Sequence, residues 1–462
     1  MLTILRYQTG ILYTCFFICI QICSAVADDS PKKLWQTIHI LDLETAQWIA
    51  LAENANFAAS TERIGQAMAQ KKQAGAAYWP KVQLSASATR AKLSDSYYNT
   101  QLAMAQLANP RAEIDDPIEN YGVNLSISYV LFDGFLSKHH YLSAKMGQEI
   151  SQAQHKQSKR LLLQMVANVF FRTQLARENI AIAEANIDFY QQKLKEAKAR
   201  QSIGSGSLSD SLNFQVQLNA ARTTLIQTNE SYQLALLDMA DSLGIPCFSN
   251  QVTLANLETE KDEELSEPDV QNFLDTAYHH RPEIVLYQKL IQQAEHQEKA
   301  AKASHYPVIQ VNGQYNGERL DNYRWGDADF GNSITANLTY PIFSGGYYQE
   351  KIKQTKYRVK EIQKIRQHIQ KNIDTQVRQA IERVKAAQEQ VGLERDNAIL
   401  VQRNRNLVEK EYAAGQNSLV RLNEAQKDLI TAKSRSAAAL VSLHQAWQNL
   451  MAETGQIVLI FE

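Results

Sequence analysis

The sequence contains an internal repeat, and this repeat limits the folds that the chain can adopt. Segment 131–134 (Leu-Phe-Asp-Gly) recurs as Ile-Phe-Ser-Gly at 342–345, which is 211 positions later. Farther upstream the separation is 227 positions, so the first copy holds 16 additional residues between Pro80 and Leu131. The other matches are Tyr78-Trp79-Pro80 with His305-Tyr306-Pro307, Gly204 with Gly415, Ser207 with Ser418, and Gly244 with Gly455. The chain is therefore expected to fold as two similar units.

Proline placement predicts long helices in both copies. No proline occurs between Pro117 and Pro246 or after Pro341, and both stretches are rich in Ala, Gln, Glu, Lys and Leu. We expect one helix of 69 residues in each copy, at 135–203 and 346–414, and each would be ~104 Å long. Shorter helices return at 207–243 and 416–452, and further helices of about 35 residues are expected at 43–78 and 269–304.

Segment 245–268 separates the two copies. It contains Pro246, Pro268 and an acidic run at 258–264, which favours a small side domain at mid-height of the helices. A flexible linker is the alternative. Each copy would then form two antiparallel rods of equal length, one continuous and one interrupted.

Four segments alternate apolar and polar residues, as β-strands do when one face is apolar. They lie at 82–92, 123–131, 308–319 and 334–342. Their length and pattern suit strands that cross an outer membrane, although a soluble hairpin would show the same alternation. Four strands cannot close a barrel, whereas three chains would supply twelve. The predicted fold is therefore mainly α with a small transmembrane β part, in which a trimer forms a 12-stranded β-barrel continued by an α-helical barrel.

The N-terminus resembles a secretory signal. Arg6 precedes an apolar run from Ile11 to Ile22, and Ala25-Val26-Ala27 suits cleavage before Asp28. An uncleaved anchor is the alternative, and a lipid anchor is not expected at Cys23. Only Cys247 lies outside this segment, so no internal disulfide is expected, and we interpret Cys247 as a buried or loop thiol without a role. The formal net charge of −1 argues against nucleic acid as a partner.

These features divide the chain into five parts. The first repeat contains a strand pair at 81–131 and a helical hairpin at 135–243, and the second contains a strand pair at 308–343 and a helical hairpin at 346–452. The five parts are a signal peptide (1–27), the first repeat (28–244), a mid-height equatorial segment (245–268), the second repeat (269–455) and a C-terminal tail (456–462).

The duplicated motifs resemble those of the TolC-type outer-membrane efflux and secretion channels, from about Leu43 to Gly455. The resemblance rests on the strand-boundary residues Pro80, Gly134, Pro307 and Gly345, on the tip turns at Gly204 and Gly415, and on Arg281-Pro282-Glu283. It implies a homotrimer in the outer membrane that extends into the periplasm. It also implies outer-membrane lipid, a periplasmic adaptor (membrane fusion) protein and an inner-membrane RND or ABC transporter as partners, with no cofactor.

The same resemblance implies a periplasmic gate at the helical tips. Ser209 and Asp210 match polar positions that tie neighbouring tip helices together, and Tyr412 matches a tyrosine just before the second tip glycine. Family members often carry an acidic residue five or six positions past this glycine. Here Arg421 follows instead, with Glu424 one turn further, so any acidic ring would depend on Glu424 alone.

An enzymatic function is not expected, because no Ser-His-Asp ordering, phosphate-binding loop or Cys-x-x-Cys motif is present. The pairs His139-His140 and His279-His280 are poor metal ligands, since adjacent helical side chains point about 100° apart. The remaining alternative is a structural periplasmic coiled coil without channel activity. The 16 additional residues are expected in an outward loop within 93–118.

Overall fold

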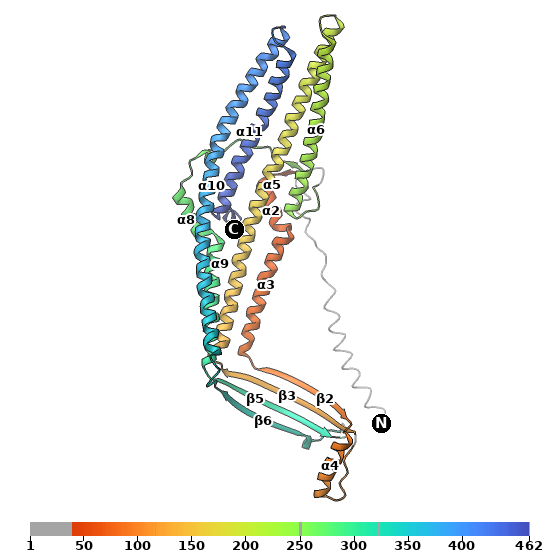
Figure 1. The fold of residues 1–462 in the computed structure, drawn as a ribbon, viewed down its shortest axis with the longest axis vertical. Helices are drawn as coiled ribbons and strands as arrows, with labels where there is room; N and C mark the ends of the chain where they lie inside the picture. Colours follow the sequence, from red (N-terminus) through yellow and green to blue (C-terminus); the bar gives the residue numbers. More distant parts are fainter. Residues whose placement is uncertain (1–38, 116, 249–251, 321–323, 462) are drawn as a thin grey trace.

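The computed structural model describes residues 39–115, 117–248, 252–320 and 324–461. The signal peptide predicted at 1–27 lies outside these residues. The helical hairpin tips lie at one end of the molecule and a four-stranded sheet lies at the other (Figure 1). The mainly helical fold is thereby confirmed.

Two long helical hairpins form the upper part of the molecule. In the first, α5 (Leu136–Ser202) is followed by α6 (Leu208–Leu243), and in the second, α10 (Tyr347–Ala413) is followed by α11 (Leu419–Glu453). Helices α5 and α10 contain 67 residues each, which corresponds to ~100 Å. Neither contains proline, so no backbone hydrogen bond is interrupted along their length.

The segments expected to be helical at 43–78 and 269–304 are helical, but each is divided into two helices. The first forms α2 (Leu43–Glu53) and α3 (Ala55–Gly75), and the second forms α8 (Val270–His280) and α9 (Pro282–Lys302). The breaks fall at Asn54 and Arg281, which are 227 positions apart and therefore equivalent in the repeat. Both residues have extended backbones, with ψ angles of 112° and 119°.

Local chemistry explains both breaks. The side chain of Asn54 accepts a hydrogen bond from the backbone N–H of Phe57 and so caps α3. Arg281 precedes Pro282, which disfavours a helical backbone before it and begins α9. The two side chains also donate to equivalent carbonyl oxygens of the returning helices. Asn54 Nδ2 lies 3.1 Å from the oxygen of Ser242, and an Arg281 guanidinium nitrogen lies 2.9 Å from that of Glu453.

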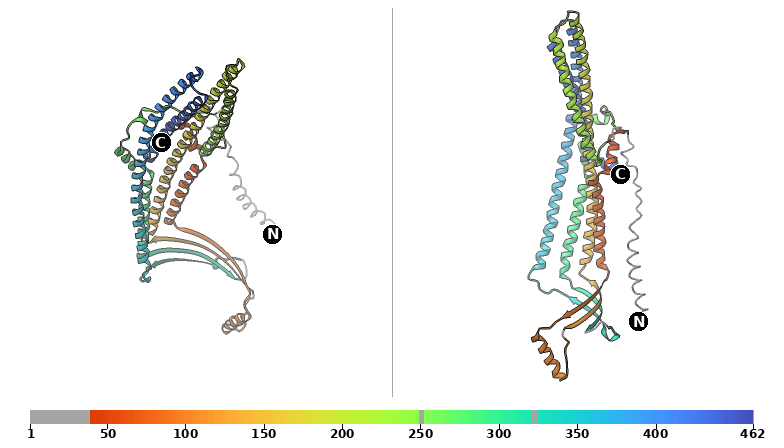
Figure 2. Two further views of the ribbon diagram at one scale, coloured as in Figure 1. Left: turned by 45° about the horizontal axis from the view of Figure 1, so that its top comes forward. Right: turned by 90° about the vertical axis from the view of Figure 1, so that its right-hand side faces the viewer.

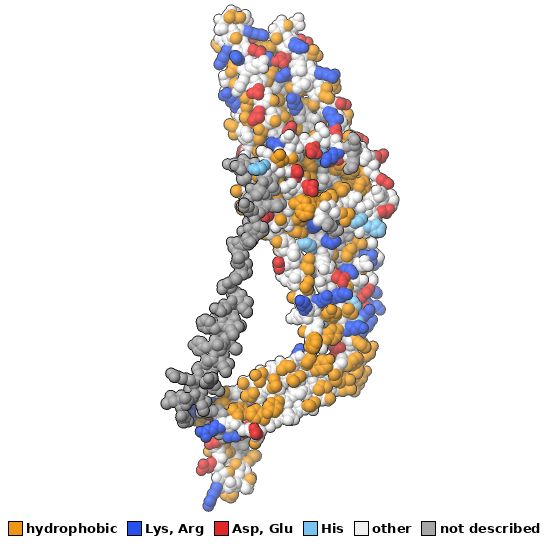
Figure 3. Space-filling view, turned by 180° about the vertical axis from the view of Figure 1, so that it is seen from behind, with side chains coloured by type: hydrophobic (Ala, Val, Ile, Leu, Met, Phe, Trp, Pro, Cys, Tyr) orange, Lys and Arg blue, Asp and Glu red, His pale blue; other side chains and the backbone are white. Residues whose placement is uncertain are grey.

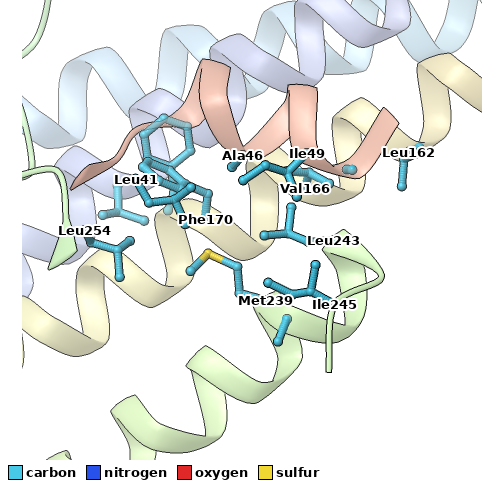
Figure 4. Packing of buried hydrophobic residues seen from close by; sticks show 14 residues of the cluster. Leu41, Ala46, Ile49, Leu162, Val166, Phe170, Met239, Leu243, Ile245 and Leu254 are labelled. Atoms are coloured by element: carbon cyan, nitrogen blue, oxygen red, sulfur yellow. The ribbon is translucent and has the colours of Figure 1, made fainter. Parts of the chain in front are cut away.

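We call the break at Asn54 the first joint. A hydrophobic cluster packs the helices together there (Figure 4). Ile49 of α2, Phe170 of α5 and Met239 of α6 are almost completely buried in it. It also includes Leu41 of β1 (Ile40–Leu41), which pairs in parallel with Leu254 of β4 (Thr253–Leu254). Each such side chain contributes about 1.5–3 kcal/mol by burial. The start of the described chain and the equatorial segment are thus fixed to the same point of the bundle.

The four-stranded sheet has the order β2-β3-β5-β6, and all neighbouring strands are antiparallel. Its strands are β2 (Lys81–Ala91), β3 (Ile118–Phe132), β5 (Val308–Leu320) and β6 (Phe330–Thr339). The last strand ends two residues before Pro341, which cannot donate a backbone hydrogen bond. The two hairpins have the same register, because Lys81 faces Ser128 in one and Val308 faces Thr339 in the other, at repeat-equivalent positions.

This register places apolar residues in rows across the sheet. Val82, Ile127 and Ile334 share one row and one face, while the adjacent row on the opposite face is polar and consists of Gln83, Ser126, Gln314 and Ser333. Figure 3 shows apolar side chains covering one side of the strands, in contrast to the charged surface of the helices above. The alternation predicted from sequence therefore gives the sheet one apolar face and one polar face.

The connection between β2 and β3 contains a helix, α4 (Asp95–Ala108), at the far end of the sheet (Figures 1 and 2). The prediction of a loop within 93–118 is therefore wrong in secondary structure, because part of this stretch is helical. Ser94 caps the helix by accepting from the backbone N–H of Tyr97, and the Ala- and Gln-rich run up to Ala108 contains no proline. Across the described residues, we find no helix that combines the length and apolar character needed to cross a membrane.

The tail at 456–462 begins with a short helix, α12 (Gln456–Leu459), whose Ile457 and Val458 are buried against α5. Cys247, interpreted as a buried or loop thiol, lies exposed in the loop after α6, in agreement with the loop alternative. Within the equatorial segment the described residues form β4 and one short helix, α7 (Asp262–Leu265).

Candidate functional site

The two helical tips have the same turn. Gly204 and Gly415 both have φ of +74°, a conformation that favours glycine. In the first tip, the N–H groups of Gly204 and Ser205 donate to the carbonyls of Gln201 and Arg200 at 3.0 and 2.9 Å. Repeat-equivalent bonds close the second tip at 3.1 and 2.8 Å. Ser207 and Ser418 then cap α6 and α11, so each tip is a short turn with both ends fixed.

Tyr412 and Asp210 are brought together just below these turns. The Tyr412 hydroxyl group donates to Oδ2 of Asp210 across 3.5 Å, and the Tyr412 ring meets Phe214 edge to face with centroids 6.1 Å apart. The Arg200 guanidinium lies 5.9 Å from the same ring centroid. Burial, and then the Asp210 carboxylate, raise the pKa of Tyr412. The phenol therefore stays protonated at neutral pH and can act as the donor.

The other predicted gate residues lie on exposed surface. Ser209 is exposed in the first turn of α6, next to Asp210. Arg421 and Glu424 form an ion pair of 3.4 Å within α11, and their side chains are 48% and 58% exposed. Exposed pairs of this kind contribute only about 0.2–1 kcal/mol. The charge of Glu424 is therefore partly neutralised by Arg421 but remains accessible to solutes.

A second set of contacts between the two hairpins was not predicted from sequence. Lys193 of α5, whose side chain is only 6% exposed, pairs with Glu409 of α10 at 2.7 Å. Arg405 pairs with the same carboxylate at 2.8 Å and lies 4.5 Å from the Phe189 ring centroid. Gln426, also buried, accepts from Arg405 and donates to Asn186. No local sequence signal shows which charged residues of a coiled coil will meet across hairpins, so these residues were missed.

A buried ionic cluster surrounds the break at Arg281, which we call the second joint and which lies far below the tips. Arg281 pairs with Glu283 at 2.8 Å and with Glu453 at 2.5 Å. Arg160 of α5, with 4% of its side chain exposed, reaches the same two carboxylates at 3.2 and 3.7 Å. Burial alone would raise the pKa of Glu283, but the two arginines outweigh it and hold that pKa below its usual value. The cluster contains two positive and two negative groups, so its charges balance.

The strand-boundary residues lie where the sheet meets the helices. Pro80 and Pro307 directly precede β2 and β5. Gly134 has φ of +66°, and a Cβ atom there would lie 2.6 Å from Cβ of Tyr306, so only glycine fits. Gly345 also has a positive φ of +60°, yet nothing in the described chain lies within 4 Å of a Cβ at that position.

One histidine of the first adjacent pair contacts a histidine of another helix. The ring of His139 stacks on His296 of α9, with centroids 5.7 Å apart, rather than meeting His140. Within the described ranges, no group of three or more His, Cys, Asp or Glu side chains is arranged to hold a metal ion.

Comparisons with known proteins agree with this geometry. The family model described as outer membrane efflux protein matches residues 49–245 and 273–456. The chain is 21% identical over 428 residues to the pyoverdine export outer membrane protein OpmQ of Pseudomonas aeruginosa, covering 92% of this chain and 87% of OpmQ.

Two solved structures have the same fold. One is a membrane protein from Pseudomonas aeruginosa, with a TM-score of 0.75, 16% identity and coverage of 89% of this chain and 93% of that one. The other is the open state of the Neisseria gonorrhoeae MtrE outer membrane channel, with a TM-score of 0.73, 17% identity and coverage of 89% and 88%. The chain therefore belongs to the outer membrane efflux protein family, the TolC-type channels, and is an outer-membrane protein that extends into the periplasm.

Proposed function

We propose that three copies of this chain form an export channel. Their sheets would join into a 12-stranded barrel across the outer membrane, and their helical hairpins would continue it as an α-helical tunnel through the periplasm. The observation that carries this proposal is the sheet itself, which has one apolar face, one polar face and two edge strands, β2 and β6, that each pair with a single neighbour in the described chain. Edge strands exposed to lipid leave backbone groups without hydrogen bonds, at a cost of several kcal/mol for each group.

Closure of the barrel by other copies removes these edges. A barrel of about eight strands is just wide enough for side chains to fill, and a wider barrel leaves an aqueous lumen. Twelve strands with the apolar rows outward would present Val82, Ile127 and Ile334 to lipid. The polar row that contains Gln83 and Ser126 would then line a wet interior.

We further propose that the tips act as a gate. Tyr412 and Asp210 tie the two hairpins of one copy together, and Ser209, Arg421 and Glu424 remain exposed beside them. A partner that binds the splayed tips better than the closed ones would shift the equilibrium toward the open state.

The channel needs energy from elsewhere, because it carries no nucleotide-binding motif of its own in the sequence. We propose that a periplasmic adaptor protein couples it to an inner-membrane transporter of the RND or ABC class. Its relatives include a pyoverdine export protein and an alkaline protease secretion protein. The cargo is therefore proposed to be a small molecule or a secreted protein.

Reconstitution tests the channel directly. The purified protein should have three times the mass of one chain by light scattering and should give discrete conductance steps in planar bilayers. Two neighbouring residues of β6 provide a matched pair of variants. Ile334→Arg places a charge on the apolar face, at a cost of about 2–4 kcal/mol near the bilayer midplane, and should reduce assembly in the outer membrane. Ser333→Arg on the polar face should assemble and alter conductance. A monomer without conductance would disprove the proposal.

A further inference from the structure

Helix α4 exposes an apolar stripe in the single chain. The stripe consists of Tyr97, Met104 and Leu107, whose side chains are 53%, 66% and 89% exposed. Spacings of seven and three residues place the three side chains on one side of a helix with 3.6 residues per turn. We call these three residues the α4 stripe.

The other side of α4 packs against its own chain. The hydroxyl group of Tyr98 donates to the carbonyl oxygen of Ile114, and Nε2 of Gln106 donates to that of Ala112, both at 3.4 Å. Leu102 is half-buried on the same side. The segment that returns to β3 therefore covers this side of the helix, and the α4 stripe faces away from it.

The stripe carries no charge. The single charged side chain of α4 is Asp95, two residues before Tyr97 and therefore on the other side of the helix. The Tyr97 hydroxyl group accepts a hydrogen bond of 2.9 Å from Gln101 of the same helix, so the ring can be buried without losing that bond. These properties suit an apolar partner rather than a charged one.

Helix α4 lies on the polar side of the sheet. Figure 3 looks from behind at the apolar face of the strands. In the right-hand view of Figure 2 the back of the molecule is on the right, and α4 lies on the left. In the proposed barrel, whose polar face lines the interior, α4 would therefore lie toward the lumen rather than toward lipid.

Each chain supplies one such helix. Between β5 and β6 the described residues form only a short helical turn at Asp327–Asp329, so the first hairpin alone carries a long helix at its outer end. A trimer would thus place three copies of α4 around its three-fold axis. Each would stay close to the rim of the barrel, because only residues 92–94 join β2 to α4.

The dimensions match those of the opening. Twelve strands spaced about 4.8 Å apart and tilted by about 40° enclose a barrel about 24 Å across. The 14 residues of α4 form a helix ~21 Å long and ~10 Å wide. Packed helices lie about 8–10 Å apart, so a cluster of three is about 20 Å across.

We propose that the α4 helices of three copies pack on one another through the α4 stripe and cover the outer mouth of the barrel as a lid. Removal of the three stripes from water holds the lid closed. The contact is small and free of ion pairs, so outgoing cargo can part the helices. This inference rests on the proposed trimeric channel and adds a closed outer end to it.

Disulfide cross-linking tests the contact between copies. In a Cys247→Ser background, Met104→Cys should form covalent dimers under mild oxidation. Three thiols around a three-fold axis can form only one disulfide, so one chain in three should remain single and no covalent trimer should appear. Asn99→Cys, at an exposed position on the other side of α4, is the matched control and should give little product.

Thiol labelling on intact cells tests whether the helices cover the mouth. Ser126→Cys, on the polar face of β3, is labelled in the same background by a reagent too large for general porins. Replacing residues 95–108 by a short Gly-Ser linker should speed labelling at least several-fold. Met104→Asp with Leu107→Asp, which keeps the helix but places charges in the stripe, should have the same effect, and Asn99→Asp should have none.

The outcomes separate the lid from the channel. In a protein that is trimeric by light scattering, absent cross-linking through position 104, or equal cross-linking through 99 and 104, would overturn the contact. Labelling of Ser126→Cys that is unchanged without α4 would overturn the lid. A spin label at Leu107→Cys that is more accessible to oxygen than to a water-soluble nickel complex would place the stripe in lipid and also overturn it. A monomeric protein would overturn the proposed channel itself.

Discussion

The hydroxyl group of Tyr412 donates a hydrogen bond of 3.5 Å to Asp210, although the two residues belong to different repeats and are 202 positions apart. This is longer than the roughly 2.5–3.0 Å typical of O–H···O bonds. Both residues lie next to the solvent-exposed tips. The bond therefore stabilises the contact between the two hairpins by only about 0.5–1.5 kcal/mol, less than a shielded hydrogen bond to a charged group would. A contact of this strength can hold a closed arrangement and still yield to a binding partner.

Removing this contact should open the tips. We predict that Tyr412→Phe combined with Asp210→Ala leaves the trimer folded and raises single-channel conductance in planar bilayers, because three ties are lost by symmetry. Asp188→Ala removes an exposed carboxylate of α5 away from the tip and should leave conductance unchanged. Equal conductance in the double variant and the wild type would show that the contact does not restrict the pore.

The exposed ion pair at the second tip should control ion selectivity. Glu424→Gln removes the negative partner and is predicted to weaken the preference for cations, whereas Arg421→Gln frees Glu424 and should strengthen it. Reversal potentials in a KCl gradient measure both effects. Screening should reduce the difference at high salt, because the two side chains are about half exposed. Shifts of the same sign in both variants would contradict this role.

The two mid-height joints should differ in strength. Arg281→Ala leaves Glu283 and Glu453 without their main partner, and removal of one side of a buried ion pair typically costs about 3–5 kcal/mol. Asn54→Ala at the equivalent position loses a cap and one hydrogen bond, at a cost of about 1–2 kcal/mol. Denaturant unfolding followed by circular dichroism compares the two. A smaller loss for Arg281→Ala than for Asn54→Ala would refute this ranking.

The same cluster predicts a pH dependence at low pH. The pKa of Glu283 is depressed in the folded state, so its contribution is present above the unfolded pKa of a glutamate and is lost as pH falls through the folded value. The wild-type protein should lose stability on acidification more steeply than Glu283→Gln, measured by thermal unfolding between pH 6 and pH 3. Parallel curves for the two proteins would contradict the assignment.

The helix α4 lies at the far end of the sheet from the helical bundle, which places it outside the cell in the proposed topology. An epitope inserted after Asn109, at the exposed end of α4, should be labelled by antibody on intact cells. The same epitope inserted near Gly204 should be labelled only after permeabilisation. The reverse pattern would invert the topology.

The sequence predicted the repeats, the long helices and the two faces of the sheet, because each depends on periodicity or on proline, which act locally. It did not predict the breaks at Asn54 and Arg281. There the backbone leaves the helix to place a side chain on a carbonyl of the returning helix, and that partner is known only once the fold is formed. Helix α4 was not predicted for another reason. Its capping residue Ser94 and its Ala-rich run are present in the sequence, but the segment lies between two predicted strands, where a loop was expected.

The candidate site was predictable to a similar extent. Tyr412 and Asp210 could be proposed because both are placed relative to a tip glycine. The contacts of Lys193 with Glu409 and of Arg160 with Glu283 depend on which faces of separate helices meet. Charged residues are too frequent along these helices for spacing alone to select them.

The joints at Asn54 and Arg281 also have a mechanical consequence. Each repeat combines one helix that runs without interruption from strand to tip with a second rod made of separate pieces. Because α5 and α10 are continuous, a displacement at a tip moves the whole helix as one rigid element. Helices α6 and α11 can instead pivot where they meet the joints, at the height of the equatorial segment. Movement of the tips can then be absorbed at mid-height, and the strands of the sheet need not change their pairing.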